Sequence, residues 1–128
     1  MKSETKKKAV AFEFVLEELY SLEPRVRPMF GSHAVYVKEK IVLILRRRTS
    51  YPEDNGVWLA TSREHHDSLK KYLPSMRTIA LFGGGESAWQ NLPADSEHFE
   101  EEVMKACSLI LRGDPRIGKT PKRRVKKT

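Results

Sequence analysis

Apolar residues along the chain recur with two periods, one typical of helices and one typical of strands. Within residues 9–22 they fall at helical spacing, and Pro24 ends the pattern; the stripe consists of Phe12, Val15, Leu16, Leu19 and Leu22. A later stripe is capped by Asp95 or Ser96 and ends at Gly113; its members are Phe99, Val103, Ala106 and Ile110. Both segments are therefore predicted to be helices with one buried face.

Between these two helices the pattern predicts a third helix and several strands. Thr61 and Glu64 have the spacing of a capping box, so a helix of about three turns is predicted to follow and to stop before Pro74. Pro28 restricts the first predicted strand to a sheet edge. The strands are predicted at residues 25–30, 33–38, 41–45, 57–60, 78–82 and 87–92.

The predicted order is α-β-β-β-β-α-β-β-α, which places the chain in the α+β class. Short connections between consecutive strands predict hairpins, and therefore a curved antiparallel sheet with the helices packed on one face. Arg46 and the two arginines after it are predicted to leave the sheet for water. The core is predicted to contain Phe12, Val15, Leu16, Leu19, Val35, Val37, Val42, Ile44, Leu59, Leu69, Ile79, Leu81, Phe99, Val103, Ala106 and Ile110.

The length of 128 residues fits one domain, predicted at residues 9–112, and the net charge of +7 is spread unevenly. Residues 112–128 hold eight Lys or Arg and one acid, and residues 2–8 hold four Lys and one acid. Residues 9–111 hold 12 basic and 15 acidic side chains. Because residues 113–128 have few apolar side chains and two prolines, they are predicted to be a disordered basic tail.

The predicted tail supplies the candidate contacts to nucleic-acid phosphates, because attraction to polyanions is expected where the positive charge is concentrated. These candidates are Arg116, Lys119, Lys122, Arg123, Arg124, Lys126 and Lys127. A second candidate patch combines residues 46–48 with Arg25 and Arg27. The alternative is that residues 46–48 are a solvated strand end paired with acids such as Glu53 or Asp54.

Two glycine-containing segments resemble anion sites. Residues 113–120 match the phosphate-loop spacing G-x-x-x-x-G-K-[ST], which requires a strand before the loop and a helix after it. Here a helix is predicted before the loop and Pro121 follows it, so the match is predicted to be inert. Residues 83–85 are three glycines that form either an anion-binding nest of amides or a flexible hairpin loop.

The sequence predicts no catalytic residues, metal or cofactor. The four histidines, His33, His65, His66 and His98, include no i, i+4 pair that would present two ligands to zinc. Cys107 is the single cysteine and is predicted to be a buried structural thiol. No apolar run approaches the ~18 residues of a membrane span, and no signal-peptide apolar region follows the first residues. A cytoplasmic protein without a membrane partner is therefore expected.

Residues 27–37, Arg-Pro-Met-Phe-Gly-Ser-His-Ala-Val-Tyr-Val, resemble the R-x-M-F-G-G-x-x-x-Y segment of TfoX N-terminal-like domains. The matching residues include Met29, Phe30, Gly31 and Tyr36, whereas Ser32 replaces the second glycine. Residues 88–93 and the acidic helix after them are similar to a portion shared with YjbR (MmcQ)-like domains. The resemblance implies a compact α+β fold and a regulatory role in competence or DNA-linked processes, and it brings no catalytic residues.

Three kinds of function remain open at this point. The first is a non-enzymatic regulatory or binding module that associates with nucleic acid through its basic tail, which predicts binding that weakens steeply with salt. The second is an adaptor that binds a peptide or partner protein through its sheet or a groove, with an inert tail. The third is an enzyme of unrecognised type, which would need a concave pocket with strongly shifted pKa values.

Overall fold

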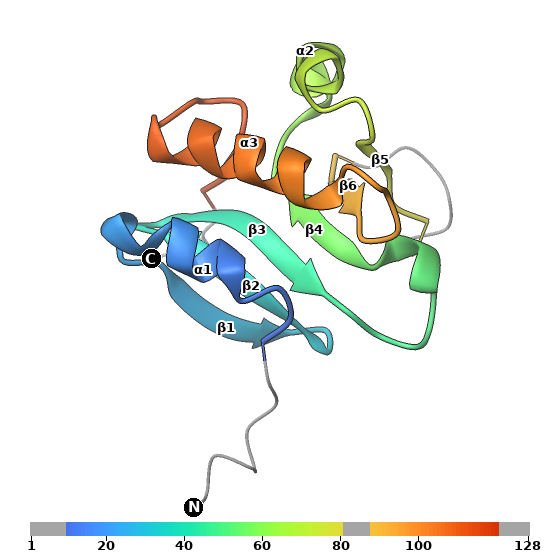
Figure 1. The fold of residues 1–128 in the computed structure, drawn as a ribbon. Helices are drawn as coiled ribbons and strands as arrows, with labels where there is room; N and C mark the ends of the chain where they lie inside the picture. The colour runs from blue at the N-terminus through green and yellow to red at the C-terminus, as the bar shows by residue number, and fades with distance from the viewer. Residues whose placement is uncertain (1–9, 81–87, 121–128) are drawn as a thin grey trace, which may run out of the picture.

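The structure is a computed structural model of the chain and describes residues 10–80 and 88–120. In this part of the chain, six strands form one antiparallel sheet in the order β1-β2-β3-β4-β6-β5. Together with three helices they follow the chain order α-β-β-β-β-α-β-β-α, which confirms the predicted α+β class (Figure 1). The strands are β1 (Arg25–Met29), β2 (Ser32–Val37), β3 (Lys40–Arg46), β4 (Gly56–Leu59), β5 (Arg77–Thr78) and β6 (Gln90–Pro93).

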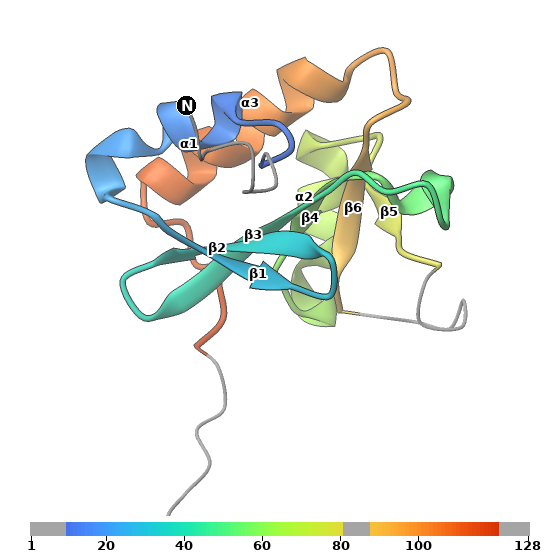
Figure 2. The same ribbon diagram turned by 90° about the horizontal axis from the view of Figure 1, so that it is seen from below.

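The three α-helices pack on one face of the curved sheet, as the sequence predicts. They are α1 (Phe14–Glu18), α2 (His66–Tyr72) and α3 (Phe99–Leu111), and short 3-10 helices lie at η2 (Tyr20–Leu22), η3 (Pro52–Asp54) and η4 (Arg63–His65). Figures 1 and 2 show α1 and α3 side by side over the sheet. We call this side the helical face, and the opposite side of the sheet the open face.

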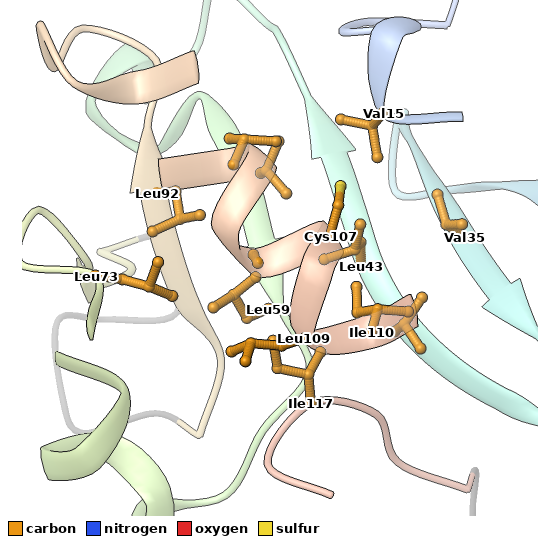
Figure 3. Packing of buried hydrophobic residues seen from close by; sticks show 14 of the residues in the cluster. Val15, Val35, Leu43, Leu59, Leu73, Leu92, Cys107, Leu109, Ile110 and Ile117 are labelled. Carbon is orange, nitrogen blue, oxygen red and sulfur yellow. The ribbon is translucent and has the colours of Figure 1, made fainter. Parts of the chain in front are cut away.

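The helical face carries the larger apolar cluster, which joins residues of all three helices to β2, β3, β4 and β6 (Figure 3). The open face carries a smaller cluster, made of Ala34, Ile41, Ile44, Trp58, Ala60 and Ile79, to which none of the three helices contributes. A register shift between Val35 and Tyr36 accompanies the bend of β2 and β3. Figure 2 shows the β1–β2 ribbon without a helix in front of it.

Most of the predicted core is buried, including Val15, Leu59 and Val103. Four predicted members are only partly buried, packed against the helical-face cluster: Phe12, Leu16, Val37 and Phe99. Leu81 lies outside the described residues. The prediction omits several fully or almost fully buried side chains: Leu43, Leu45, Trp58, Leu73, Met76, Leu92, Leu109 and Ile117.

Two helix starts differ from the prediction. The first helix is short, because Phe12 has a left-handed φ of 56° and the α-helical turns end before Leu19. The predicted capping box does not form: Glu64 contacts the ring of His65 at 3.3 Å, and the chain enters α2 through a 3-10 turn. Local spacing thus identifies both helices and misplaces their ends.

The two strands of the second hairpin are shorter than predicted. The strand expected at residues 78–82 is the two-residue β5, and the strand expected at residues 87–92 is β6. The three glycines at residues 83–85 lie outside the described part of the chain. β1 is an edge strand, as Pro28 predicts.

Residues 113–120 pack against the domain, contrary to the predicted boundary at residue 112. Gly113 has a φ of 74°, and its N–H and that of Asp114 donate to the carbonyls of Ile110 and Leu109. This is the Schellman pattern that terminates a helix at glycine, so the predicted stop is confirmed. The chain then buries Ile117, which is 4% exposed, and Lys119 exchanges two backbone hydrogen bonds with Ile41. Ile117 is a single apolar residue in a segment of glycines, prolines and charged residues, so the sequence pattern does not reveal that it is buried.

Candidate nucleic-acid interface

The open face of the sheet aligns basic and aromatic side chains in cross-strand rows. One row runs across four adjacent segments as Arg25, Tyr36, Ile41 and Lys119. Because directly opposed residues of antiparallel strands point to the same face, these four side chains lie on one surface. A second row contains Arg27, Ala34, Ile44, Trp58, Asn91 and Arg77. The rows bring residues far apart in the sequence onto one face.

Arg25 and Arg27 are exposed on β1 and lie about 7 Å apart, two strand residues along the same face. The guanidinium carbon of Arg25 lies 5.3 Å from the centre of the Tyr36 ring, and its Nη2 donates to the carbonyl of Lys38 at 2.7 Å. Among the described residues, neither arginine forms an ion pair with a carboxylate. Both charges are therefore available to an anionic ligand.

At the far edge of the sheet, Arg77 is engaged within the protein. Its Nη2 donates to the carbonyl of Glu53 at 2.7 Å and lies 3.9 Å from the carboxylate of Asp95. The unpaired positive charge of the open face is thus concentrated on β1 and at Lys119. This end of the face is the candidate interface.

Six of the acids of the folded part lie on the helical side of the molecule, at α1 and α3. α1 carries Glu17 and Glu18, and Glu13 directly precedes it. The first turn of α3 contains Glu100, Glu101 and Glu102. Apart from Glu102, which accepts from the amide of Ser75, these side chains are exposed. A large part of the acidic charge of residues 9–111 is therefore carried by the helices and not by the strand positions of Arg25 and Arg27.

The turn between β1 and β2 carries the residues of the family-like motif. Phe30 and Gly31 both have left-handed φ values, 52° and 77°. A Cβ at residue 31 would overlap Nη1 of Arg48, which donates to the carbonyl of Phe30 at 3.4 Å. Glycine is favoured here by its left-handed φ, and the Arg48 guanidinium occupies the space that a Cβ would fill. Phe30 itself is 78% exposed, whereas Met29 and Tyr36 pack against the open-face cluster.

Residues 46–48 do not form the predicted patch. Arg46 is 2% exposed and donates to the carbonyls of Ser50 and Tyr51 and to Asn55 Oδ1, each at 2.9 Å. Burial lowers the pKa of the Arg46 guanidinium. Arg47 lies over the Phe12 ring at 4.6 Å, on the helical side. The prediction that Arg46 leaves the sheet for water is therefore wrong, because the following loop folds back and offers it three acceptors.

Of the predicted phosphate contacts in the C-terminal segment, two lie in the described residues. Arg116 is held by Asp114, with Nη2 to Oδ2 at 2.9 Å and Nε to Oδ1 at 3.0 Å, and it also donates to Ser68. This pairing lowers the pKa of Asp114 to about 2 and engages Arg116 in the fold. Lys119 is exposed and lies on the open face. The others, Lys122, Arg123, Arg124, Lys126 and Lys127, lie outside the described part of the chain.

The phosphate-loop match has no cradle of free amides. The N–H of Gly118 donates to Ala60 at 2.7 Å and that of Lys119 donates to Ile41 at 3.0 Å. Ile117 lies between the two glycines of the motif, and its side chain is buried in the core, so this part of the segment is fixed against the domain. The segment also follows α3 rather than a strand.

We expect the chain neither to bind ATP at micromolar affinity nor to hydrolyse it, because the amides of this loop are already bonded. Isothermal titration with Mg-ATP and a phosphate-release assay measure both properties, and Lys119→Ala is expected to change neither. Magnesium-dependent hydrolysis that disappears in Lys119→Ala would contradict this reading of the loop.

A groove of about 660 Å³ lies beside this segment, between the end of α3 and the β2–β3 turn. Its apolar lining includes Val37, Val42 and Ile110, and its charged lining includes Lys38 and Arg112. This groove is the feature that favours the adaptor alternative, because it offers apolar contact to a peptide.

Cys107 is a buried free thiol on α3. Burial raises the pKa of the Cys107 thiol to about 12, so at neutral pH the side chain is a protonated thiol, as predicted. Among the described residues, no group of three or more His, Cys, Asp or Glu side chains is arranged to hold a metal ion. No helix in the same part of the chain has the length and apolar character to cross a membrane.

No known protein family, characterised protein or solved structure matches the chain significantly. The resemblance to TfoX N-terminal-like and YjbR-like domains therefore stays a prediction.

The rows of the open face depend on strand register and on the fold of residues 113–120. The sequence signal that could have indicated them is the period-two spacing of Arg25 and Arg27 on an edge strand.

Proposed function

We propose that this protein is a non-enzymatic nucleic-acid-binding module, whose contact surface is the basic end of the open face continued by the C-terminal basic segment. The observation that carries the proposal is the row of Arg25, Tyr36, Ile41 and Lys119. The row joins the start of the C-terminal segment to the exposed arginines of β1. With a strand spacing of about 4.8 Å, Arg25 and Lys119 lie roughly 14 Å apart across the sheet.

Charge supports this surface over the rest of the molecule. Lys119 is followed by five Lys or Arg within residues 121–128, and six glutamates of the domain lie at α1 and in the first turn of α3. A polyanion that approaches this face meets cations from both the sheet and the C-terminal segment, and it avoids α1 and the start of α3. The resemblance to TfoX N-terminal-like domains points in the same direction.

The test is the salt dependence of binding. For a mixed-sequence duplex, we expect the full chain to show a log–log slope near −5, because each neutralised phosphate contributes about 0.9. Truncation after Thr120 removes five cations and is expected to reduce the slope to about −2 to −3 and to weaken binding strongly. Duplexes of different sequence are expected to compete equally. Fluorescence anisotropy at several salt concentrations measures all three quantities.

The matched control compares two pairs of charges. Arg25→Ser/Arg27→Ser removes two cations from the open face, and Lys70→Ser/Lys71→Ser removes two from α2, on the helical side. We expect the first pair of substitutions to make the slope less negative by about 2, and the second pair to leave the slope unchanged. Equal effects of the two pairs, or no salt-dependent binding by the full chain, would refute the proposed function.

The adaptor alternative predicts the opposite salt response. A peptide in the groove beside Val42 and Ile110 would bind through apolar contact, so its affinity would change little with salt. Loss of binding in Val42→Asp combined with an unchanged response to Arg25→Ser/Arg27→Ser would favour the adaptor. The two functions are therefore separated by the same pair of variants.

A further inference from the structure

We infer that the open face binds single-stranded nucleic acid in preference to duplex, an inference that rests on the proposed function. The observation is the combination of one exposed and one half-buried aromatic ring, Phe30 and Tyr36, with the arginines of β1 on a sheet face that no described helix covers. Aromatic side chains stack favourably on unpaired bases, whereas the ring faces of bases in a duplex are already stacked on one another.

Two rings frame the arginines. The half-buried Tyr36 lies at one end of the β1–β2 ribbon, with the guanidinium of Arg25 at 5.3 Å from its centre. Phe30 lies at the other end, in the turn, and is 78% exposed. The four-residue span between Ser32 and Tyr36 separates the two ends by about 13 Å. Arg25 and Arg27 lie between them, on the neighbouring strand.

The turn fixes Phe30 in its exposed position. Its left-handed φ, the Gly31 that follows and the Arg48 guanidinium on its carbonyl all constrain the backbone that carries the ring. Arg48 is in turn set by Asn55, whose Oδ1 accepts from the Arg48 amide at 2.8 Å and from buried Arg46 at 2.9 Å. Phe30 also borders a small pocket with Met29 and Trp58, which places it at the open face.

The helices are unsuited to duplex readout. A helix that enters the major groove needs basic or polar side chains aimed at bases and phosphates. α1 and the first turn of α3 carry glutamates, and α2 has seven residues, fewer than two full turns. A single strand laid on the ribbon can place phosphates against Arg25, Arg27 and Lys119 and can stack bases on Phe30 and on the Arg25–Tyr36 pair.

The test compares a mixed-sequence single strand with its own duplex, using the full chain and fluorescence anisotropy. We expect the single strand to bind at least about tenfold more tightly at the same salt concentration. Phe30→Ser is expected to weaken single-strand binding roughly 5- to 100-fold and to leave duplex binding unchanged. Tyr20→Ser is the matched control, because Tyr20 is 79% exposed but lies in η2 on the helical side.

The outcomes separate the inference from the proposed function. Equal affinity for the two forms, or equal effects of Phe30→Ser and Tyr20→Ser on single-strand binding, overturns the inference and leaves nucleic-acid binding intact. Binding of neither form at low salt refutes the proposed function itself. Tyr36→Leu keeps an apolar side chain on the open-face cluster and removes the ring, so a loss of single-strand affinity with an unchanged melting temperature supports the second stacking position.

Discussion

Val103→Asp is expected to unfold the protein. Val103 is fully buried on the inner face of α3, within the cluster that joins α3 to the sheet. An unpaired carboxylate in this position costs several kcal/mol, against a total stability of roughly 5–15 kcal/mol for a domain of this kind. Thermal denaturation followed by circular dichroism measures the effect. We expect the cooperative transition to be lost or to move to much lower temperature.

The control for this variant is Met104→Asp, one residue further along the same helix. Met104 is 39% exposed, so the same new charge meets water instead of the core. Its melting temperature is expected to change by a few degrees at most. If Val103→Asp melts cooperatively at the wild-type temperature, the assignment of the inner face of α3 is wrong.

The fold was predictable where a local period repeats over several residues. The stripe of α3 recurs over three turns, and its buried members Val103, Ala106 and Ile110 follow from spacing alone. β3 is identified by its run of β-branched and apolar residues. Shorter signals were less reliable: the capping box at Thr61 failed because Glu64 contacts His65 instead of an amide.

The parts that could not be predicted depend on contacts between distant segments. Arg46 is buried because the loop after β3 folds back and residues 50, 51 and 55 accept its hydrogen bonds. The sequence shows only a strand end followed by two more arginines, which does not predict this burial. Ile117 is one apolar residue among prolines, glycines and charges, so composition alone assigns it to a disordered tail. The row that joins Lys119 to Arg25 requires the docking of residues 117–119 and the register of two strand pairs, β1–β2 and β2–β3.

The docking of Ile117 also changes where the chain can be cut. Truncation after Arg112 is expected to destabilise the domain by about 2–4 kcal/mol, because it removes a buried Ile side chain and the hydrogen bonds made with Ile41 and Ala60. For a domain of this size, the melting temperature is expected to fall by roughly 10 °C. Truncation after Thr120 removes none of these contacts and is expected to leave the melting temperature within a few degrees of that of the full chain.

Ile117→Ala in the full chain provides the independent check. It keeps every residue and charge of the C-terminal segment and deletes only the buried side chain, so it is expected to cost about 2–4 kcal/mol in urea denaturation. If truncation after Arg112 and Ile117→Ala both leave stability unchanged, residues 113–120 are not part of the folded unit. If both destabilise as expected, the loss of binding after a cut at Arg112 would mix unfolding with lost charge. The chain truncated after Thr120 is then the variant that isolates the contribution of the terminal cations to binding.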